Sequence, residues 1–249
     1  IVNDPVHQVM DFGSDDKLRE VMKKLLDTKS FQRLRRISQL GLASFVFPGA
    51  THTRFCHSLG AAYLAHQVLE HLGDQERKFS REIERNKTEI ILSALLHDIG
   101  HGPFSHSFEH VLEGIDGLSD LPSHEDWTST IILSRGSDVF QALNENGLSP
   151  DLIASTFKAK SKRKFPRFLK QIVSSQLDVD RMDYLVRDSH FAGVALGKID
   201  VQYLINCLHI VKHGKSKSFS LGLTPKGVKP YEGFLIARHM MNRTVYYHR

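Results

Sequence analysis

The chain has 249 residues, of which 41% are hydrophobic and 24% are charged, proportions that are typical of a globular protein with a sizeable core. Its 33 basic and 28 acidic residues give a formal net charge of +5, a mild bias towards anionic partners that does not favour nucleic acid over nucleotides. Two cysteines are too few for a disulfide framework, and no apolar run approaches a membrane span. We therefore expect a protein of the cytoplasm, or of the nucleus if the source is eukaryotic, with no membrane partner.

Helical periodicity dominates the first part of the chain. Apolar residues recur at three- and four-residue steps over Leu18–Leu26 and Phe31–Leu40, and again over Leu59–Leu72, where Gly73 is the expected C-terminal stop. Thr88 is expected to cap the helix that follows it. These patterns favour helices over strands.

Helix starts and one hairpin are predicted farther along the chain. Ser123 and Asp126 form a capping-box pattern, and Ser149 followed by proline is a favourable helix start. Apolar residues within Leu208–Leu223 flank the turn-rich segment His213–Ser216, which indicates a β-hairpin. We therefore predict a mainly α fold with one short β-hairpin.

The segment His97–His106 is the most informative part of the sequence. His97 and Asp98 close the apolar run Ile90–Leu96, which is typical of a buried helix, and two more histidines follow in a turn broken by glycine and proline. Burying a histidine-aspartate pair is costly unless its charge is compensated, and a divalent cation supplies that compensation. The clustering therefore indicates a metal site rather than isolated structural histidines.

Three polar faces elsewhere in the chain could meet this segment. At 100° per residue, one arc of the helix predicted over Asp178–Asp188 carries Asp180, Arg181, Tyr184, Arg187 and Asp188. The last helix carries Arg238, Asn242 and Tyr246, and the segment after Phe47–Ala50 carries His52, Arg54 and His57. Amphipathic surface helices and hydrogen-bonded core histidines are the alternative interpretations of these patterns.

Together these faces offer the parts of a metal and phosphate site. The candidate metal ligands are His57, His97, Asp98 and Asp180. Such mixed nitrogen and oxygen ligands leave positions open for water and substrate, and they suit Mn, Mg, Fe or Ni. The candidate phosphate-binding groups are Arg54, Arg181, Arg238 and Tyr184, and the candidate proton donors are His101, His106 and His124.

An ordered series of motifs covers most of the chain: Asp4–His7, Phe31–Arg35, Phe47–Ala50, Arg54–Gly60, His97–His106, Ser123–Glu125 and Asp178–Tyr184. With this succession the chain resembles the HD-domain phosphohydrolases, specifically their deoxynucleoside-triphosphate triphosphohydrolase branch. The resemblance implies a single HD-type catalytic domain over residues 1–249, truncated at its C-terminus relative to family members. It further implies metal-dependent hydrolysis of dGTP and other dNTPs to deoxynucleoside and inorganic triphosphate.

The resemblance also implies a role for each candidate residue. The divalent metal would be held by His57, His97, Asp98 and Asp180. The triphosphate would be bound by Arg54, Arg181, Tyr184 and Arg238, and the sugar and base would be contacted by Asp188, Gln39, Leu40 and Tyr246. Water activated by the metal would attack the α-phosphorus, and the catalytic group would comprise His106 as proton donor with His101, His124 and Asp98.

Regulation and assembly follow from the same resemblance. In this branch, nucleotides bind at subunit contacts, so a homo-oligomer (dimer or tetramer) activated by GTP or dGTP is implied. The positions that match the nucleotide-reading residues are Asp27, Gln32, Arg33 and Arg35; an ordinary solvated helix surface is the alternative. Gln8 stands where relatives usually carry glycine, and we expect the backbone there to be less permissive.

Two other functions remain open on the sequence. An HD phosphatase or phosphodiesterase acting on another phosphorylated substrate would use the same ligands, because ligands alone do not fix the leaving group. A nucleotide- or nucleic-acid-binding regulator with a vestigial site is the third hypothesis. The presence of every expected ligand and candidate acid in the sequence favours an enzyme over such a regulator.

Overall fold

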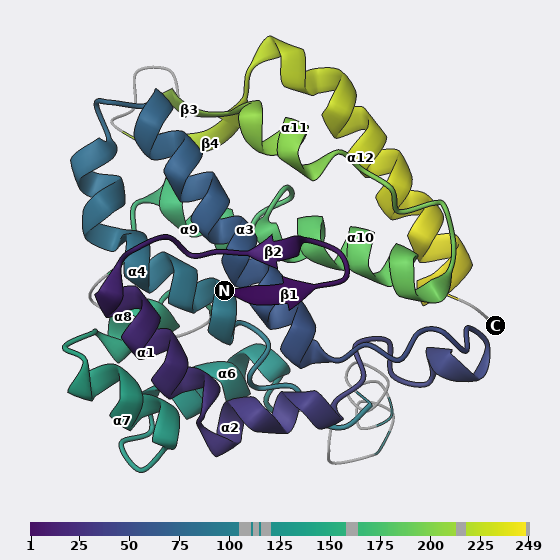
Figure 1. The fold of residues 1–249 in the computed structure, drawn as a ribbon, viewed down its shortest axis with the longest axis horizontal. Coiled ribbons are helices and arrows are strands. Elements are labelled where there is room, and N and C mark those ends of the chain that lie inside the picture. The colour runs from purple at the N-terminus through teal and green to yellow at the C-terminus, as the bar shows by residue number, and fades with distance from the viewer. Residues whose placement is uncertain (105–110, 112–114, 116–120, 158–163, 213–217, 248–249) are drawn as a thin grey trace.

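The computed structural model describes residues 1–104, 111, 115, 121–157, 164–212 and 218–247. Helices dominate these residues, and two small antiparallel strand pairs accompany them (Figure 1). The longer helices are α1 (Asp16–Leu26), α3 (Arg54–Gln75), α4 (Ser80–Leu96), α6 (His124–Leu133), α7 (Asp138–Glu145), α10 (Val179–Ala192) and α12 (Val228–Met241). The shorter helices include α2 (Lys29–Gln32), α8 (Pro150–Ala154), α9 (Arg167–Val173) and α11 (Val201–Asn206). The predicted mainly α fold is therefore confirmed.

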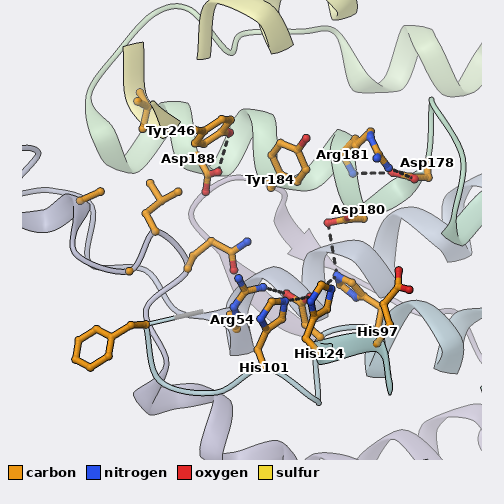
Figure 2. Close-up of a pocket in the computed structure, with 18 of the residues that line it drawn as sticks. Arg54, His97, His101, His124, Asp178, Asp180, Arg181, Tyr184, Asp188 and Tyr246 are labelled. Atoms are coloured by element: carbon orange, nitrogen blue, oxygen red, sulfur yellow. Dashed lines mark hydrogen bonds and ion pairs between the residues drawn. The ribbon is translucent and has the colours of Figure 1, made fainter. Parts of the chain in front are cut away.

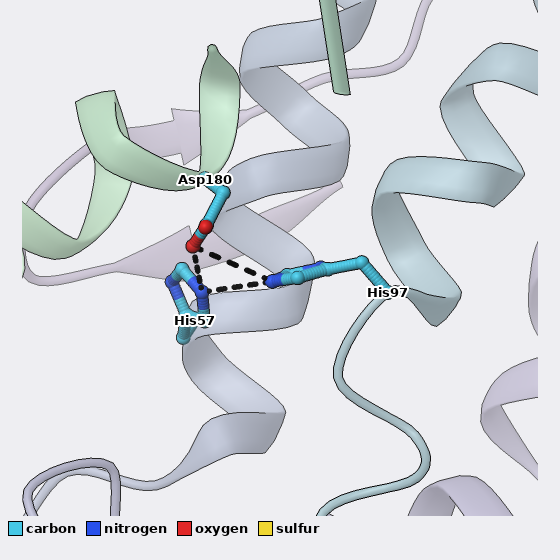
Figure 3. Close-up of side chains that lie close together, drawn as sticks. All are labelled: His57, His97 and Asp180. Atoms are coloured by element: carbon cyan, nitrogen blue, oxygen red, sulfur yellow. Dashed lines mark hydrogen bonds and ion pairs between the residues drawn. The ribbon is translucent and has the colours of Figure 1, made fainter. Parts of the chain in front are cut away.

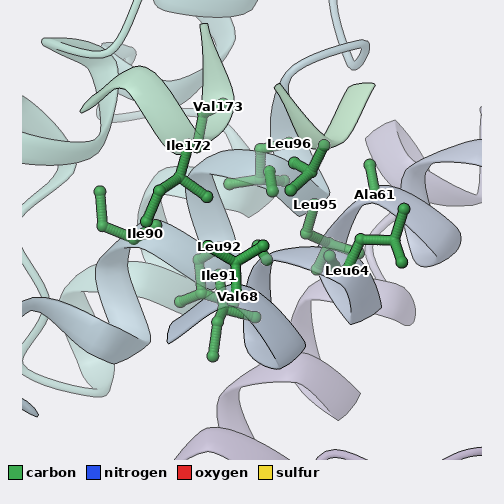
Figure 4. Packing of buried hydrophobic residues seen from close by; sticks show 14 of the residues in the cluster. Ala61, Leu64, Val68, Ile90, Ile91, Leu92, Leu95, Leu96, Ile172 and Val173 are labelled. Carbon is green, nitrogen blue, oxygen red and sulfur yellow. The ribbon is translucent and has the colours of Figure 1, made fainter. Parts of the chain in front are cut away.

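Helices α3 and α4 form the centre of the fold and pack along each other (Figures 1 and 4). Their facing side chains are fully or almost fully buried, as at Ala61, Leu64 and Val68 on α3 and at Ile91 and Leu95 on α4. Each buried leucine or isoleucine contributes about 1.5–3 kcal/mol from removal of apolar surface from water. This packing fixes the helix termini that carry the site residues.

Helix α10 crosses α3 at a point where only glycine fits. A Cβ atom built on Gly60 would lie 1.8 Å from Asp183 Oδ1 and 2.5 Å from Arg187 Nη2. Both of those side chains project from α10 and are fully buried. The glycine therefore lets polar groups of α10 reach the first turns of α3.

The structure confirms some predicted helix ends and corrects others. Ser123 and Asp126 form the expected reciprocal capping box of α6, and Ser149 caps α8 with proline in its first turn. Helix α3 continues through Gly73 to residue 75, and α4 begins at residue 80, so Thr88 lies inside a helix instead of capping one. Packing between α3 and α4 outweighs the local stop and cap signals.

The predicted hairpin is present as β3 (Leu208–Lys212) and β4 (Phe219–Leu223), with Ile210 paired to Leu221. Its predicted turn, His213–Ser216, lies outside the described residues. A second hairpin, β1 (Val2–Asp4) with β2 (Gln8–Met10), was not predicted, because strands of three residues carry little periodic signal.

The second strand of this N-terminal hairpin begins at a residue with an unusual backbone conformation. Gln8 adopts φ +59°, a left-handed conformation that is readily accessible to glycine and costs other residues about 1–2 kcal/mol. Asp4 Oδ1 accepts hydrogen bonds from the backbone N–H groups of Val6 and His7, each at 2.9 Å, and so stabilises the turn.

Among the helices of the described ranges, none combines the length and the apolar character that crossing a bilayer requires.

Candidate functional site

Three side chains from three helix regions converge on one point (Figure 3). His57 lies in the first turns of α3, His97 directly follows α4, and Asp180 lies in the first turn of α10. His57 Nε2 is 3.0 Å from Asp180 Oδ1 and 3.1 Å from His97 Nε2, and His97 Nε2 is 3.5 Å from the same carboxylate oxygen. All three ligand atoms lie within 4.8 Å of one another, so these residues are positioned to bind one metal ion.

Asp98 lies at the edge of this group and is also held by Arg54. Its Oδ1 is 3.4 Å from His97 Nε2, and its Oδ2 is 3.7 Å from His57 Nε2. Arg54 Nη1 donates a hydrogen bond to Oδ2, and both partners are buried. The carboxylate thus faces the two histidines, while its bond to Arg54 links the candidate cation site to the candidate phosphate-binding group.

Both histidines are oriented by hydrogen bonds on their far sides. His57 Nδ1 is 2.7 Å from Asp183 Oδ2, and His97 Nδ1 is 2.7 Å from the carbonyl oxygen of Ala94. Since both partners are acceptors, each Nδ1 carries the proton, and each Nε2 is left to act as a ligand. Such outer partners fix ring orientation and raise ligand basicity at metal sites.

Asp183 belongs to a buried ion network that sequence reasoning missed. Arg187 Nε donates to Asp183 Oδ2 at 2.8 Å, Arg187 Nη1 donates to Asp4 Oδ2 at 2.8 Å, and His7 Nε2 lies 2.6 Å from Asp183 Oδ1. Although burial opposes ionisation, Arg187, His57 and His7 hold the pKa of Asp183 well below its usual range. The network therefore keeps a negative charge behind His57.

Arg187 lies on the same helical arc as Asp180, as predicted, but its side chain is fully buried. Asp183 and Asp4 satisfy its guanidinium there. Helical spacing alone could not separate a charged residue that points to solvent from one with buried partners. The Asp4–His7 motif and Gly60 carried a signal of this network, since both contact it.

The electrostatics of the three-residue group favour a cation. Burial disfavours a charged imidazole, but hydrogen bonds with Asp180 and Asp183 outweigh burial and raise the pKa of His57 to about 10. Asp180 responds in the opposite sense: burial acts to raise the pKa of its carboxyl, but hydrogen bonds with His57 and His97 hold that pKa far below its usual range. The buried carboxylates therefore stabilise positive charge next to the imidazole Nε2 atoms. A divalent cation bound to these nitrogen and oxygen atoms would supply that charge.

A cavity of about 810 Å³ opens beside the group and has chemically different ends (Figure 2). Asp188 and Tyr246 lie at one end, Arg181 and Asp178 lie at the other, and His97 and Arg54 line the cavity between them. A cavity of this volume is within the range of small-molecule sites.

The end that contains Asp188 is polar and pre-organised. Asp188 Oδ2 accepts a hydrogen bond from the Tyr246 hydroxyl at 2.8 Å, and burial beside this carboxylate raises the pKa of Tyr246 well above its usual value. Gln39 and Leu40 line the same cavity, and Gln39 Oε1 is buried with no hydrogen-bond partner among the described residues.

Two of the three candidate proton donors lie at the cavity. His101 and His124 stack with ring centroids 4.1 Å apart, and both line the cavity. Burial, opposed by the nearby Asp98 carboxylate, lowers the pKa of His101 to about 4, so this ring is neutral at neutral pH. His106 lies outside the described residues.

The candidate phosphate-binding residues divide between the cavity and its surroundings. Arg54, Arg181 and Tyr184 line the cavity, and Arg181 Nη1 pairs with the Asp178 carboxylate. Arg238 does not line this cavity, and its Nη1 donates to Gln176 Oε1 at 3.3 Å. The structure therefore brings three of the four candidate phosphate-binding residues to one cavity and leaves Arg238 outside its lining.

The candidate activator residues are mostly engaged within the chain. Arg33 donates to the carbonyl oxygens of His101 at 2.6 Å and Ile99 at 2.5 Å, so its guanidinium braces the turn after Asp98. Arg35 Nε donates to Gln32 Oε1 at 2.9 Å and its guanidinium covers the Phe55 ring. Asp27 alone of the proposed set is exposed without such a contact in the described part of the chain. The structure therefore gives Arg33 an internal partner that the sequence did not reveal.

Comparison with known proteins adds family information to this geometry. The chain is 36% identical over 256 residues to the Bacillus subtilis protein YwfO, a match that covers 100% of this chain and 52% of that relative. It is 34% identical to the Mycoplasma genitalium protein MG461 over 233 residues, which are 93% of this chain and 53% of that relative. The chain thus spans about half the length of these curated relatives.

A human relative is named for an activity. The human protein deoxynucleoside triphosphate triphosphohydrolase SAMHD1 is 32% identical over an alignment of 216 residues, gaps included, and the match covers 78% of this chain and 33% of the human protein. Family models match at two places: an HD-associated region at residues 199–249 and an HD domain at residues 54–188. The second match begins at Arg54, three residues before His57, ends at Asp188 and encloses every member of the converging group. The chain therefore belongs to the HD-domain family.

Proposed function

We propose that the chain is a phosphohydrolase that converts deoxynucleoside triphosphates, dGTP among them, to deoxynucleosides and inorganic triphosphate. The observation that carries this proposal is the group positioned to bind a cation, beside a cavity with Arg181 at one end and the hydrogen-bonded pair of Asp188 and Tyr246 at the other. The similarity to a named deoxynucleoside triphosphate triphosphohydrolase supports it.

A divalent metal would be held by His57, His97 and Asp180, with Asp98 as the fourth ligand. When bound, the metal would lower the pKa of the attacking water and offset phosphate charge. The family and the donor set are compatible with Mn, Mg, Fe or Ni.

Substrate would lie along the cavity with its sugar near Asp188. The Asp188 carboxylate would accept a hydrogen bond from the sugar 3′-hydroxyl, and Gln39 and Leu40 would pack where a ribose 2′-hydroxyl would lie. Tyr246 would contact the base. Arg54, Arg181, Tyr184 and Arg238 would bind the phosphates, and bidentate guanidinium groups suit that task.

In the chemical step, the water oxygen would bond to the α-phosphorus, one proton of the water would pass to solvent, and the bond from that phosphorus to the 5′-oxygen would break. His106 would give its proton to the departing 5′-oxygen, which leaves as the hydroxyl of the deoxynucleoside, and would regain a proton from solvent. His101 and His124 donate hydrogen bonds to the α-phosphate, and the lowered pKa of His101 suits this neutral role. The three phosphates depart together as inorganic triphosphate.

Residues 1–249 would act as one HD-type catalytic unit within a homo-oligomer. An activating GTP or dGTP would bind near Asp27, Gln32 and Arg35. Because Arg33 braces the turn that carries His101, an effector that contacts its neighbours would act on the site through this residue.

Product analysis tests the proposed reaction. Each of the four dNTPs is incubated with the protein and Mg or Mn, with and without GTP, and the products are separated by anion-exchange chromatography. We expect deoxynucleoside and inorganic triphosphate in equal amounts, and none without the metal.

The same assay decides between the competing functions. Orthophosphate or pyrophosphate as the sole inorganic product would instead show an HD phosphatase or phosphodiesterase. Nucleotide binding without any product, under all metal conditions, would show a regulator with a vestigial site.

A further inference from the structure

A second, smaller cavity adjoins the end of the candidate site that contains Arg181. It has a volume of about 540 Å³ and is lined by residues of α9, of the segment between α9 and α10, and of the first turn of α10: Arg167, Lys170, Gln171, Ser174, Ser175, Gln176 and Arg181. Arg181 and Ser174 line both cavities. Figure 2 places Arg181 at the end of the first cavity that is farthest from Asp188 and Tyr246.

The charge of this second cavity is strongly one-sided. Its lining includes the cations Arg167, Lys170 and Arg181 and no carboxylate. Among the described residues, Arg167 and Lys170 form no ion pair, and Lys170 Nζ makes only a long hydrogen bond of 3.4 Å to the Ser155 carbonyl oxygen. Arg181 is paired with Asp178, so the charges left without an acidic partner in the described part of the chain are those of Arg167 and Lys170, and they raise the local concentration of anions.

Two further contacts point to an anionic occupant. Arg181 pairs with Asp178 through Nη1, but its Nε is buried with no hydrogen-bond partner in the described ranges. Arg238, which does not line the first cavity, donates to Gln176 and thereby adds a cation at the margin of the second. A buried donor without a partner is costly, and a phosphate oxygen would satisfy it.

We propose that the second cavity is a distal anion subsite, in which Arg167 and Lys170 bind the far end of a polyphosphate chain that passes Arg181. The orientation of the bound chain rests on the proposed function, because the nucleoside end of a nucleotide would then lie in the first cavity and its terminal phosphate would point to the second. It takes linear polyphosphates of three or more phosphates, including the released inorganic triphosphate.

Titration calorimetry on the metal-loaded protein tests the subsite with three probes: orthophosphate, inorganic triphosphate and inorganic tetraphosphate. In the variant Arg167→Ala/Lys170→Ala, we expect tetraphosphate to bind ~10-fold more weakly and triphosphate to be weakened less, because two solvent-accessible phosphate contacts are lost. Orthophosphate is too short to span both cavities and should bind equally well. The matched control, Lys17→Ala/Lys23→Ala on exposed positions of α1, removes the same charge and should bind all three probes normally.

Three results would overturn the subsite. Equal tetraphosphate affinity in the variant and wild type rejects it, and so does a loss of the same size for all three probes. A variant that loses affinity for a single-stranded oligonucleotide but keeps tetraphosphate affinity would identify a nucleic-acid surface instead. The proposed reaction is tested separately, by triphosphate formation from dNTPs in the wild type. If the wild type forms triphosphate and the variant binds tetraphosphate normally, the subsite alone is rejected. If the variant binds tetraphosphate more weakly but the wild type forms no triphosphate, the proposed reaction alone is rejected.

The opposite end of the first cavity carries a second, independent inference, centred on His52. Its side chain is fully buried, with Nε2 2.7 Å from Asp188 Oδ1 and the ring stacked on Phe191 at 4.6 Å. His52 Nδ1 has no hydrogen-bond partner in the described residues, so the proton belongs on Nε2, which donates to the carboxylate. The His52 carbonyl oxygen also accepts the backbone N–H of Gln39 at 3.0 Å.

We infer that His52 is a positioning residue that holds Asp188 for the sugar 3′-hydroxyl. His52 donates a hydrogen bond to Oδ1 of Asp188, and Tyr246 donates one to Oδ2. Together these two bonds fix the orientation of the carboxylate, so its remaining acceptor positions keep a fixed direction. This inference also rests on the proposed function, and its test uses the substrate atom that Asp188 is proposed to bind.

The test compares His52→Ala and His52→Gln on a dNTP and on the matching 2′,3′-dideoxynucleotide. We expect His52→Ala to lower kcat/KM for the dNTP ~10-fold, mainly through KM, and to have little effect on the dideoxynucleotide, which lacks the hydroxyl. His52→Gln, whose amide N–H can replace Nε2–H, should recover most of the loss. An equal loss on both substrates would show a merely structural role, and a wild-type protein that hydrolyses neither would reject the proposed reaction instead.

Discussion

Asp180→Ala is expected to abolish metal binding and turnover together. Asp180 is the carboxylate that joins His57 and His97 in the converging group, so its loss leaves only the Asp98 carboxylate, which is already paired with Arg54, to attract the cation. Because replacing even an outer partner of a metal ligand costs about 10–100-fold in affinity or activity, we expect losses greater than ~10²-fold here.

Metal content and thermal unfolding measure the effect directly. A metal present at about 100 times its Kd stabilises the folded state by about 2.7 kcal/mol, and this metal-dependent rise in Tm should vanish in Asp180→Ala. Asp151→Ala, which removes an exposed carboxylate on α8, is the matched control and should keep both metal and turnover. Normal turnover by Asp180→Ala would refute its assignment as a ligand.

Asp183→Asn should weaken both the fold and the metal site, although Asp183 is not a proposed ligand. The variant keeps the shape of the side chain but leaves Arg187 with one buried carboxylate instead of two. Breaking a buried ion pair costs about 3–5 kcal/mol of unfolding free energy. Loss of the negative charge behind His57 should lower metal affinity by about 10–100-fold.

The pH dependence of stability provides an independent signature. Because the pKa of Asp183 is depressed in the folded protein, its contribution is present above the unfolded-state value of about 3.9 and is lost as pH falls through the folded value. Asp183→Asn should therefore be less stable than the wild type at neutral pH, and the difference should shrink in acid.

Two measurements separate the structural role of Asp183 from its role at the metal. Urea unfolding gives the stability, and calorimetric titration of the folded variant with Mn gives the affinity. Asp138→Asn, which removes a carboxylate bonded to Ser30 far from the site, controls for a general loss of stability. A variant that is destabilised yet binds Mn as tightly as the wild type would limit Asp183 to a structural role.

Much of the fold was readable from local patterns. The helical periodicity of Leu18–Leu26 and Leu59–Leu72, the capping box at Ser123 and the hairpin that pairs Ile210 with Leu221 depend on residues close together in sequence, and the structure confirms them. The helix expected over Phe31–Leu40 is only partly present, because α2 ends at residue 32, a 3-10 turn follows to residue 36, and Ser38 instead forms a β-bridge with Thr53. The helix end predicted at Gly73 and the helix start predicted at Thr88 were wrong. Packing between α3 and α4 stabilises both helices beyond these positions, so the local stop and cap signals do not set the helix ends. The three-residue strands at the N-terminus were too short to carry a pattern.

The sequence by itself determined the chemistry of the converging group, because His57, His97 and Asp180 are residue types with strong metal preferences in recognisable motifs. Which charged groups are buried together depended on the tertiary structure. The guanidinium of Arg187 is buried with Asp183 and Asp4, and that of Arg238 donates to Gln176. Burial of a charge depends on partners distant in sequence, and a helical wheel shows the direction of a side chain without showing what lies there.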